Sequence, residues 1–309
     1  MPRARVGTLE LCWESIGDGD PLLLVMGIGA QLVHWPDGFC AALADRGFRV
    51  IRFDNRDVGE STRFDHLGMP ALRPTIARWL LGLPVEAPYG LHDMADDTAR
   101  LLDVLDVPAA HVVGASMGGM IAQLLAIRHP RRVRSLTSIM SHPGDRLSAI
   151  PRPRALKALL GPLPRTREQA QDAQVQFFRI VGSTGFAFDE ADTRERAGRH
   201  FDRGPSPAGF ARQMLAILAA SDRRPALRKL DVPAAIVHGS IDPLVVPRGG
   251  YQTAKALRNA EYVPVAGMGH DLPRGAWPII VGAIERAARR AALLDARRQG
   301  ERGVGDGDR

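Results

Sequence analysis

A serine lies among small residues in the segment 111–123, HVVGASMGGMIAQ. Gly114 and Gly118 flank Ser116, an apolar run precedes it, and a helix-like pattern follows it. In a G-x-S-x-G turn the glycines let a strand and a helix approach closely, and the hydroxyl projects beyond the strand. The helix N-terminus then offers N–H groups and positive potential to an anion. We therefore predict that Ser116 is a nucleophile rather than only a helix N-cap.

A nucleophilic serine needs a base and a group that orients the base. His270, in GMGHDLP, follows the last predicted strand, and Asp242, in HGSIDPLVVP, follows the strand before it. Parallel strands bring their carboxyl ends to one edge of a sheet, where open α/β folds place their chemistry. We expect His270 to remove the proton of Ser116 and Asp242 to orient the imidazole.

Other residues of the same types remain open as alternatives. Asp145, soon after the predicted strand 133–141, is the main alternative acid, and Asp231 is interpreted as a loop residue. Two histidines at the ends of predicted elements, His129 and His238, are interpreted as structural. Three others, His34, His142 and His200, could approach the pocket without acting as the base.

Hydrolysis through a serine also needs two backbone donors for the oxyanion. We assign one to the N–H of Met117, directly after the nucleophile, and the other to Ile28 in the turn after the run 22–27. No G-x-x-x-x-G-K-[ST] pattern follows this turn, so nucleotide binding is not expected. Two cysteines, Cys12 and Cys40, suggest neither a disulfide framework nor a metal site, and no cofactor is expected.

Strand-like and helix-like segments alternate along most of the chain. Strands are expected at 6–17 (an antiparallel pair), 21–27, 48–54, 111–116, 133–141, 232–240 and 260–267, and helices at 35–47, 91–107, 117–130, 247–259 and 276–296. The strands are largely apolar, as strands buried on both faces are. This rhythm predicts an α/β protein with a mostly parallel, doubly wound sheet.

The rhythm breaks over residues 144–225, which are rich in arginine, proline and helix formers and hold no convincing strand. We interpret this stretch as a helical lid inserted between two parts of one core, residues 1–143 and 226–294. Residues 295–309 are polar and glycine-rich and are expected to be a disordered tail.

Charge and hydropathy exclude several classes of protein. The net charge is +7, and 38 of the 41 basic residues are arginine, but they are scattered and accompany no nucleic-acid-binding motif. No apolar stretch is long enough to cross a bilayer, and the N-terminus lacks the apolar segment of a secretion signal. We expect a cytoplasmic monomer or homo-oligomer whose partner is a small molecule.

Together these motifs resemble the α/β-hydrolase superfamily over about residues 5–293. DNRDVGEST at 54–62, the serine segment, HGSIDPLVVP and GMGHDLP are its usual landmarks. Within it, LLLVMGIGAQLVHWPDGF and FFRIVGSTGFAFDEADTRERA look most like the aclacinomycin methylesterase group of serine carboxylesterases. The resemblance implies an α/β-hydrolase fold and cofactor-free ester cleavage through an acyl-serine. It assigns nucleophile, acid and base to Ser116, Asp242 and His270.

Several activities share this triad. Besides a carboxylesterase, a cofactor-free perhydrolase, a lactonase and a C–C bond hydrolase remain open, as does a catalytically silent ligand receptor. Dehalogenases and epoxide hydrolases have an aspartate in place of Ser116. Labelling of Ser116 by a fluorophosphonate would distinguish an enzyme from a receptor.

Substrate selection is expected from the segments that cover the sheet edge. Residues 65–88 form a longer apolar stretch than is expected in the methylesterase group. Its part ARWLLGLPV could pack into the core, line the pocket or form an oligomer contact. The candidate substrate-binding residues are Trp79, Leu81, His142, Phe178 and Met214.

Overall fold

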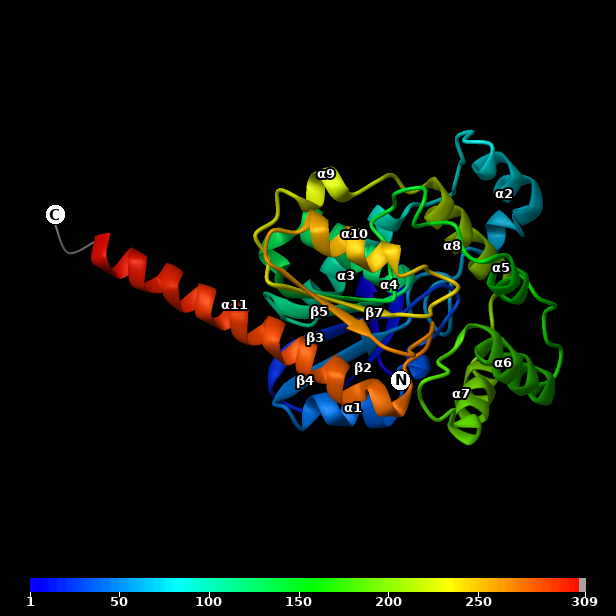
Figure 1. Cartoon of the computed structure of the whole chain (residues 1–309), viewed down its shortest axis with the longest axis horizontal. Coiled ribbons are helices and arrows are strands. Elements are labelled where there is room, and N and C mark those ends of the chain that lie inside the picture. Colours follow the sequence, from blue (N-terminus) through cyan, green and yellow to red (C-terminus); the bar gives the residue numbers. More distant parts are fainter. Residues whose placement is uncertain (306–309) are drawn as a thin grey trace.

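The computed structural model describes the backbone of residues 1–305 and the side chains of residues 1–297. Its centre is one sheet of eight strands in the order β1-β2-β4-β3-β5-β6-β7-β8. Strand β2 pairs antiparallel with both β1 and β4, and the other neighbours are parallel. The predicted mostly parallel α/β sheet is confirmed, with helices on both of its faces (Figure 1).

The elements follow the predicted alternation. The strands are β1 Arg3–Val6, β2 Leu9–Ile16, β3 Asp20–Val25, β4 Phe48–Phe53, β5 Ala110–Ala115, β6 Val133–Ile139, β7 Ala234–Gly239 and β8 Ala260–Val265. The α-helices are α1 Asp37–Ala44, α2 Leu72–Leu80, α3 Leu91–Val104, α4 Met117–Arg128, α5 Pro153–Leu159, α6 Arg167–Val181, α7 Glu190–Asp202, α8 Pro207–Ala219, α9 Arg224–Leu227, α10 Arg248–Ala256 and α11 Trp277–Gly305. Short 3-10 turns occupy Leu32–His34, Asp65–Leu67, Pro130–Arg132 and Arg274–Ala276.

The sheet divides the apolar core into two layers. Successive side chains of a strand point to opposite faces, so Leu23 and Val25 of β3 join the layer that contains helices α3 and α4. Leu22 and Leu24 join the layer that contains α1 and α11. Because both faces of β3 are buried from Leu22 to Val25, this part of its sequence is continuously apolar rather than alternating.

Residues 144–225, here called the insertion, lie between β6 and β7 and contain α5 to α8 and the start of α9. Helices α5 to α8 gather at one end of the molecule, together with α2 (Figure 1). No strand occurs in this stretch, all of which the structure describes. The helices begin with regular caps: the side chains of Thr166, Asp189 and Ser206 accept N–H groups at the starts of α6, α7 and α8.

A buried ion pair joins the insertion to the core. The guanidinium of Arg212, on α8, donates two hydrogen bonds of 2.7 Å to the carboxylate of Asp57, and Tyr89 donates a third of 2.7 Å. Burial alone would raise the pKa of Asp57, but the hydrogen bonds, led by those from Arg212, hold it below its usual value. The pair is therefore fully ionised at neutral pH and shielded from solvent.

Helix α2 differs from one interpretation of its sequence. The alternative in which ARWLLGLPV packs into the core is wrong, because α2 has no buried residue. Its partners are in the insertion: the guanidinium of Arg146 lies 5.8 Å from the ring centroid of Trp79. The segment has enough apolar residues for a core helix, but α2 packs on the outside of α8 instead.

The C-terminal helix also extends further than expected. Helix α11 continues to Gly305, where the sequence analysis expects no ordered structure after residue 294. Alanine, arginine and leucine dominate 286–298, and these are strong helix formers. Residues 306–309 of the expected tail lie outside the described residues. Among the described residues, no helix combines the length and apolar character of a membrane span.

The buried ion pair gives a first prediction. Arg212→Met should lower the free energy of unfolding by about 3–5 kcal/mol, because it leaves the carboxylate of Asp57 buried without its cation. The matched control is Arg286→Met, which removes an exposed pair with Glu261 and should cost less than about 1 kcal/mol. Urea unfolding of both variants measures the difference. Equal losses would show that the Arg212 pair contributes no more than a surface contact.

Candidate functional site

The turn between β5 and α4 holds Ser116 in a strained backbone conformation. Its φ is 55° and its ψ is −120°, a region that non-glycine residues rarely adopt. A side chain on Gly114 would collide with the backbone of Gly118, and one on Gly118 would collide with the carbonyl oxygen of Val25. Only glycines at these two positions let α4 start directly against the ends of β3 and β5.

Three side chains form a continuous hydrogen-bonded chain at the carboxyl edge of the sheet. The Nε2 of His270 lies 3.1 Å from the Oγ of Ser116, and its Nδ1 lies 2.7 Å from the Oδ2 of Asp242. An ionised carboxylate can only accept, so Nδ1 carries the proton and Nε2 is free to accept the serine proton. The structure thus brings together the three residues that the sequence analysis nominates.

The carboxylate of Asp242 is fixed from its other side. Its Oδ1 accepts the backbone N–H groups of Leu244 and Val245, each at 2.9 Å. His238 lies nearby, with Nε2 3.6 Å from Oδ2, but it donates to the carbonyl of Val245 at 2.8 Å. This histidine therefore holds the loop after β7, in line with its structural interpretation.

The alternative acid and the other histidines have different contacts. The carboxylate of Asp145 accepts the N–H of Ser148 in its own loop, with no contact to His270 among the described contacts. His129 lies 2.7 Å from Asp96 at the end of α4. His34 and His200 form a partly buried edge-to-face pair with ring centroids 4.8 Å apart, and desolvation lowers the pKa of both.

The turn after β3 lies directly beside Ser116. A Cβ built on Gly27 would lie 3.3 Å from the Cβ of Ser116. The side-chain amide of Asn55 donates to the carbonyl of Met26 at 3.0 Å and holds the start of this turn. The backbone at Gly27, directly before Ile28, therefore lies next to Ser116, and Met117 follows the serine as the first residue of α4.

Gln213 is a residue that the sequence analysis did not identify. Its Oε1 accepts the N–H of Gly29 at 2.7 Å, and its Nε2 donates to the carbonyl of Arg56 at 2.8 Å. The orientation of the amide is unambiguous, since an N–H must meet the oxygen and a carbonyl must meet the nitrogen. Gln213 is fully buried on α8, so the insertion fixes the turn that carries Ile28. No local pattern in the sequence marks it, because its partners are far away in the chain.

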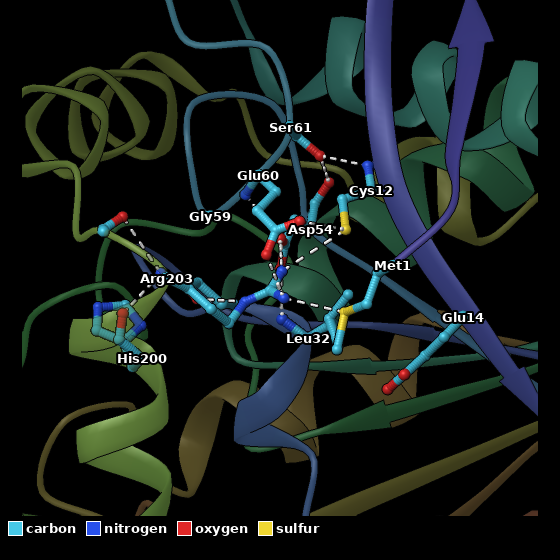
Figure 2. A network of polar contacts seen from close by, with 12 residues as sticks. Met1, Cys12, Glu14, Leu32, Asp54, Gly59, Glu60, Ser61, His200 and Arg203 are labelled. Carbon is cyan, nitrogen blue, oxygen red and sulfur yellow. Dashed lines mark hydrogen bonds and ion pairs between the residues drawn. The ribbon is translucent and has the colours of Figure 1, made fainter.

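A second set of contacts fixes the same turn further on (Figure 2). Arg203, at the end of α7, donates to the carboxylate of the fully buried Asp54 and, at 2.8 Å, to the side chain of Gln31. The other oxygen of Asp54 accepts the N–H of Leu32 at 2.7 Å. Burial raises the pKa of Asp54, and the hydrogen bonds and the Arg203 charge only partly oppose this. The insertion and the turn after β3 are thus joined through one buried carboxylate.

The loop that carries His270 is held by the insertion as well. The backbone N–H of His270 donates to the carbonyl of Val181 at 2.7 Å. The hydroxyl of Ser183 donates to the carboxylate of Asp271 at 2.5 Å and accepts the N–H of Gly269 at 3.0 Å. Both flanks of the histidine are therefore fixed by the residues that follow α6.

The predicted substrate-binding residues are not all brought to one cavity. Trp79 and His142 line a cavity of about 200 Å³ with residues of α8. Phe178 lines a separate cavity of about 300 Å³, next to Asp271 and Leu272. Met214 is buried on α8. The pocket-lining prediction is wrong for Leu81, whose side chain is 76% exposed because α2 turns that end toward solvent.

Comparison with known proteins adds the family. The profile of the family described as "alpha/beta hydrolase fold" matches residues 20–273. The chain belongs to this family. Rhodomycin D methylesterase DauP of Streptomyces sp. (strain C5) is 30% identical, across 95% of this chain and 100% of the relative. The resemblance to methylesterases inferred from the motifs is confirmed.

Further relatives are more distant. The 3-oxoadipate enol-lactonase 2 of Acinetobacter baylyi is 30% identical across 78% of this chain and 79% of its own length. The crystal structure of an enol-lactonase from Burkholderia xenovorans LB400 has a TM-score of 0.63 at 24% identity and covers 96% of this chain and 98% of that chain. A thermophilic esterase from Thermogutta terrifontis has a TM-score of 0.63 at 20% identity, and each chain is 98% covered. At these identities the solved structures show that this α/β hydrolase shares their fold.

The contact of Gln213 gives a second prediction. Gln213→Leu should lower kcat by roughly 10- to 100-fold with a smaller change in KM, because the turn beside Ser116 loses the acceptor that holds Gly29. The control is Gln123→Leu, which also removes a fully buried amide but contacts Ser138 and Arg223 instead. It should lower thermal stability with kcat unchanged. A Gln213 variant that loses stability but keeps kcat would assign Gln213 to packing alone.

Buried histidines give a third prediction. Burial, reinforced by the charges of Arg223 and His238, lowers the pKa of His142 to about 3. The unfolded chain binds a proton on this ring below about pH 6.5, whereas the folded chain does not, so stability falls as the pH falls. His142→Asn keeps an acceptor for the N–H of Gly144. When the pH is lowered from 6.5 to 5, the free energy of unfolding of this variant should fall by about 2 kcal/mol less than that of the parent.

Urea unfolding at several pH values measures this difference. His66→Asn, at an exposed position, is the matched control and should keep the pH dependence of the parent. The same pH dependence in His142→Asn and in the parent would contradict the assignment.

Proposed function

We propose that this α/β hydrolase is a serine carboxylic-ester hydrolase. One observation carries the proposal: the Oγ of Ser116, the ring of His270 and the carboxylate of Asp242 are linked by contacts of 3.1 and 2.7 Å. The serine lies at the N-terminus of α4, where backbone N–H groups and the helix dipole favour negative charge.

In the acylation step, the Oγ of Ser116 attacks the ester carbonyl carbon while its proton moves to the Nε2 of His270. The carbonyl electron pair moves onto oxygen, and the N–H groups of Met117 and Ile28 are the proposed donors to this oxyanion. When the tetrahedral intermediate collapses, the carbon–oxygen bond to the alcohol breaks, and the imidazolium returns its proton to the leaving alcohol. The negative charge of Asp242 stabilises the imidazolium throughout.

In the deacylation step, a water molecule takes the place of the serine hydroxyl. His270 removes its proton, the resulting hydroxide attacks the acyl carbon, and the proton passes to the Oγ of Ser116 as the acid leaves. Each step is a proton transfer or a substitution at a carbonyl carbon. The named side chains and backbone groups perform both without a cofactor.

The proposed substrate is a methyl ester of a carboxylic acid. Rhodomycin D methylesterase DauP aligns over its whole length, and rhodomycin D methylesterase DnrP of Streptomyces peucetius aligns over 95% of this chain at 29% identity. A methyl ester loses a small alcohol, so specificity would rest on the acyl side.

A lactone is the second candidate substrate. It is an internal ester that the same triad opens, and the 3-oxoadipate enol-lactonase 2 of Acinetobacter baylyi supports it over 78% of this chain. A panel of methyl esters and lactones of matched acyl size distinguishes the two. Only a methylesterase would release methanol from the methyl esters faster than it opens the rings of the lactones.

The nucleophile gives a fourth prediction. Ser116→Ala should lower kcat for ester hydrolysis by roughly 10⁴- to 10⁶-fold. Adding His270→Ala should cost little more, because the triad acts as a unit. A fluorophosphonate should label the parent protein and not Ser116→Ala.

Ser15→Ala, on the antiparallel strand β2, is the control and should keep both labelling and activity. Retention of near-parent activity in a folded Ser116→Ala variant would exclude Ser116 as the nucleophile. Absence of both labelling and turnover in the parent would favour a silent receptor.

A further inference from the structure

Exposed apolar side chains are concentrated in two segments, 67–83 and 146–165. Among the described side chains, 16 large hydrophobic residues are exposed, and nine of them lie in these segments. The nine are Leu67, Met69, Leu80, Leu81, Leu83, Leu147, Ile150, Leu160 and Leu163. Exposed apolar clusters of this kind mark interaction sites on folded proteins. We call the surface of these two segments the basic apolar face.

The same segments carry only positive charge. They hold seven basic residues and no aspartate or glutamate. The seven are Arg73, Arg78, Arg146, Arg152, Arg154, Lys157 and Arg165. In the described part of the chain none of the seven takes part in an ion pair, whereas arginines further along the insertion, such as Arg194 and Arg196, pair with acidic neighbours. The positive charge of this face is therefore not neutralised from within the protein.

The two segments adjoin one another. The guanidinium of Arg146 lies 5.8 Å from the ring centroid of Trp79 and donates to the carbonyl of Leu80. Helices α2 and α5, one from each segment, lie at the same end of the molecule (Figure 1). Trp79 and Arg146 also line the cavity of about 200 Å³ described above, together with Ile217 and Leu218 of α8.

We propose that the basic apolar face docks on the surface of an anionic lipid bilayer. Leucine side chains gain free energy when they enter the boundary between headgroups and acyl chains, and arginines beside them bind the negative headgroups. Either contribution alone gives weak binding, and the face supplies both. No membrane-spanning helix is needed for this mode of binding.

Charge argues against a second copy of this chain as the occupant. In a symmetric dimer the same patch would meet itself, and seven uncompensated positive charges on each side would repel one another. An anionic membrane neutralises these charges and accepts the leucines at the same time.

The test is sedimentation of the full chain with vesicles. Binding is expected to phosphatidylglycerol–phosphatidylcholine vesicles but not to phosphatidylcholine vesicles, and it should weaken about 10-fold or more in 0.5 M salt. Leu80→Ser/Leu81→Ser and Arg73→Ser/Arg154→Ser should each reduce binding about 10-fold or more. These side chains are exposed, so both variants should melt at the temperature of the parent.

Matched controls carry the same changes at exposed positions elsewhere. Ile279→Ser/Leu293→Ser controls for the leucines, and Arg5→Ser/Arg131→Ser controls for the arginines. Both should bind like the parent. Ser116→Ala should also bind like the parent, so the result is independent of the proposed hydrolysis.

Three outcomes would overturn the proposal. The first is an absence of binding to anionic vesicles, and the second is equal loss of binding in the face variants and their controls. The third is a parent dimer in light scattering that Leu80→Ser/Leu81→Ser converts to monomer, which would assign the face to contact between copies of this chain.

Discussion

The candidate site depends on buried polar contacts between the insertion and the core. Arg212 of the insertion meets Asp57, and Gln213 accepts the N–H of Gly29, in the turn whose Gly27 lies next to the serine. Ser183 binds the residue that follows His270. A buried polar group without its partner is costly, so these contacts allow essentially one position of the insertion. The insertion is therefore a fixed part of the site rather than a loosely attached cover.

The site combines strain in one loop with support from its neighbours. Ser116 adopts a backbone conformation that isolated chains avoid, and it persists because β5 and α4 are both packed in the core. His270 and Asp242 lie on loops, but every flank of those loops is hydrogen-bonded. Catalytic sites in general tolerate displacements of only about 0.5 Å, and support of this kind provides that precision.

The arginine-rich composition has several distinct structural roles. Arg203 and Arg212 are largely buried and join the insertion to acidic residues of the core. Others, such as Arg286, form ordinary exposed ion pairs. Arginines near α2 and α5, such as Arg73 and Arg154, have no acidic neighbour in either segment, so they are free to interact with a partner outside the chain. A net charge alone does not separate these roles, because it counts every arginine equally.

The sequence by itself determined the sheet and the chain order of the three candidate site residues. Buried strands are recognised as apolar runs, and this signal is local in the sequence. The G-x-S-x-G turn identified Ser116, and an acid and a histidine after later strands identified Asp242 and His270. These three could be grouped because parallel strands share one carboxyl edge. Only the tertiary structure decided the contacts of Gln213 and the exposure of Leu81. Both depend on where the insertion packs, and that is set by contacts between residues more than a hundred positions apart, which leave no periodicity or motif in the chain.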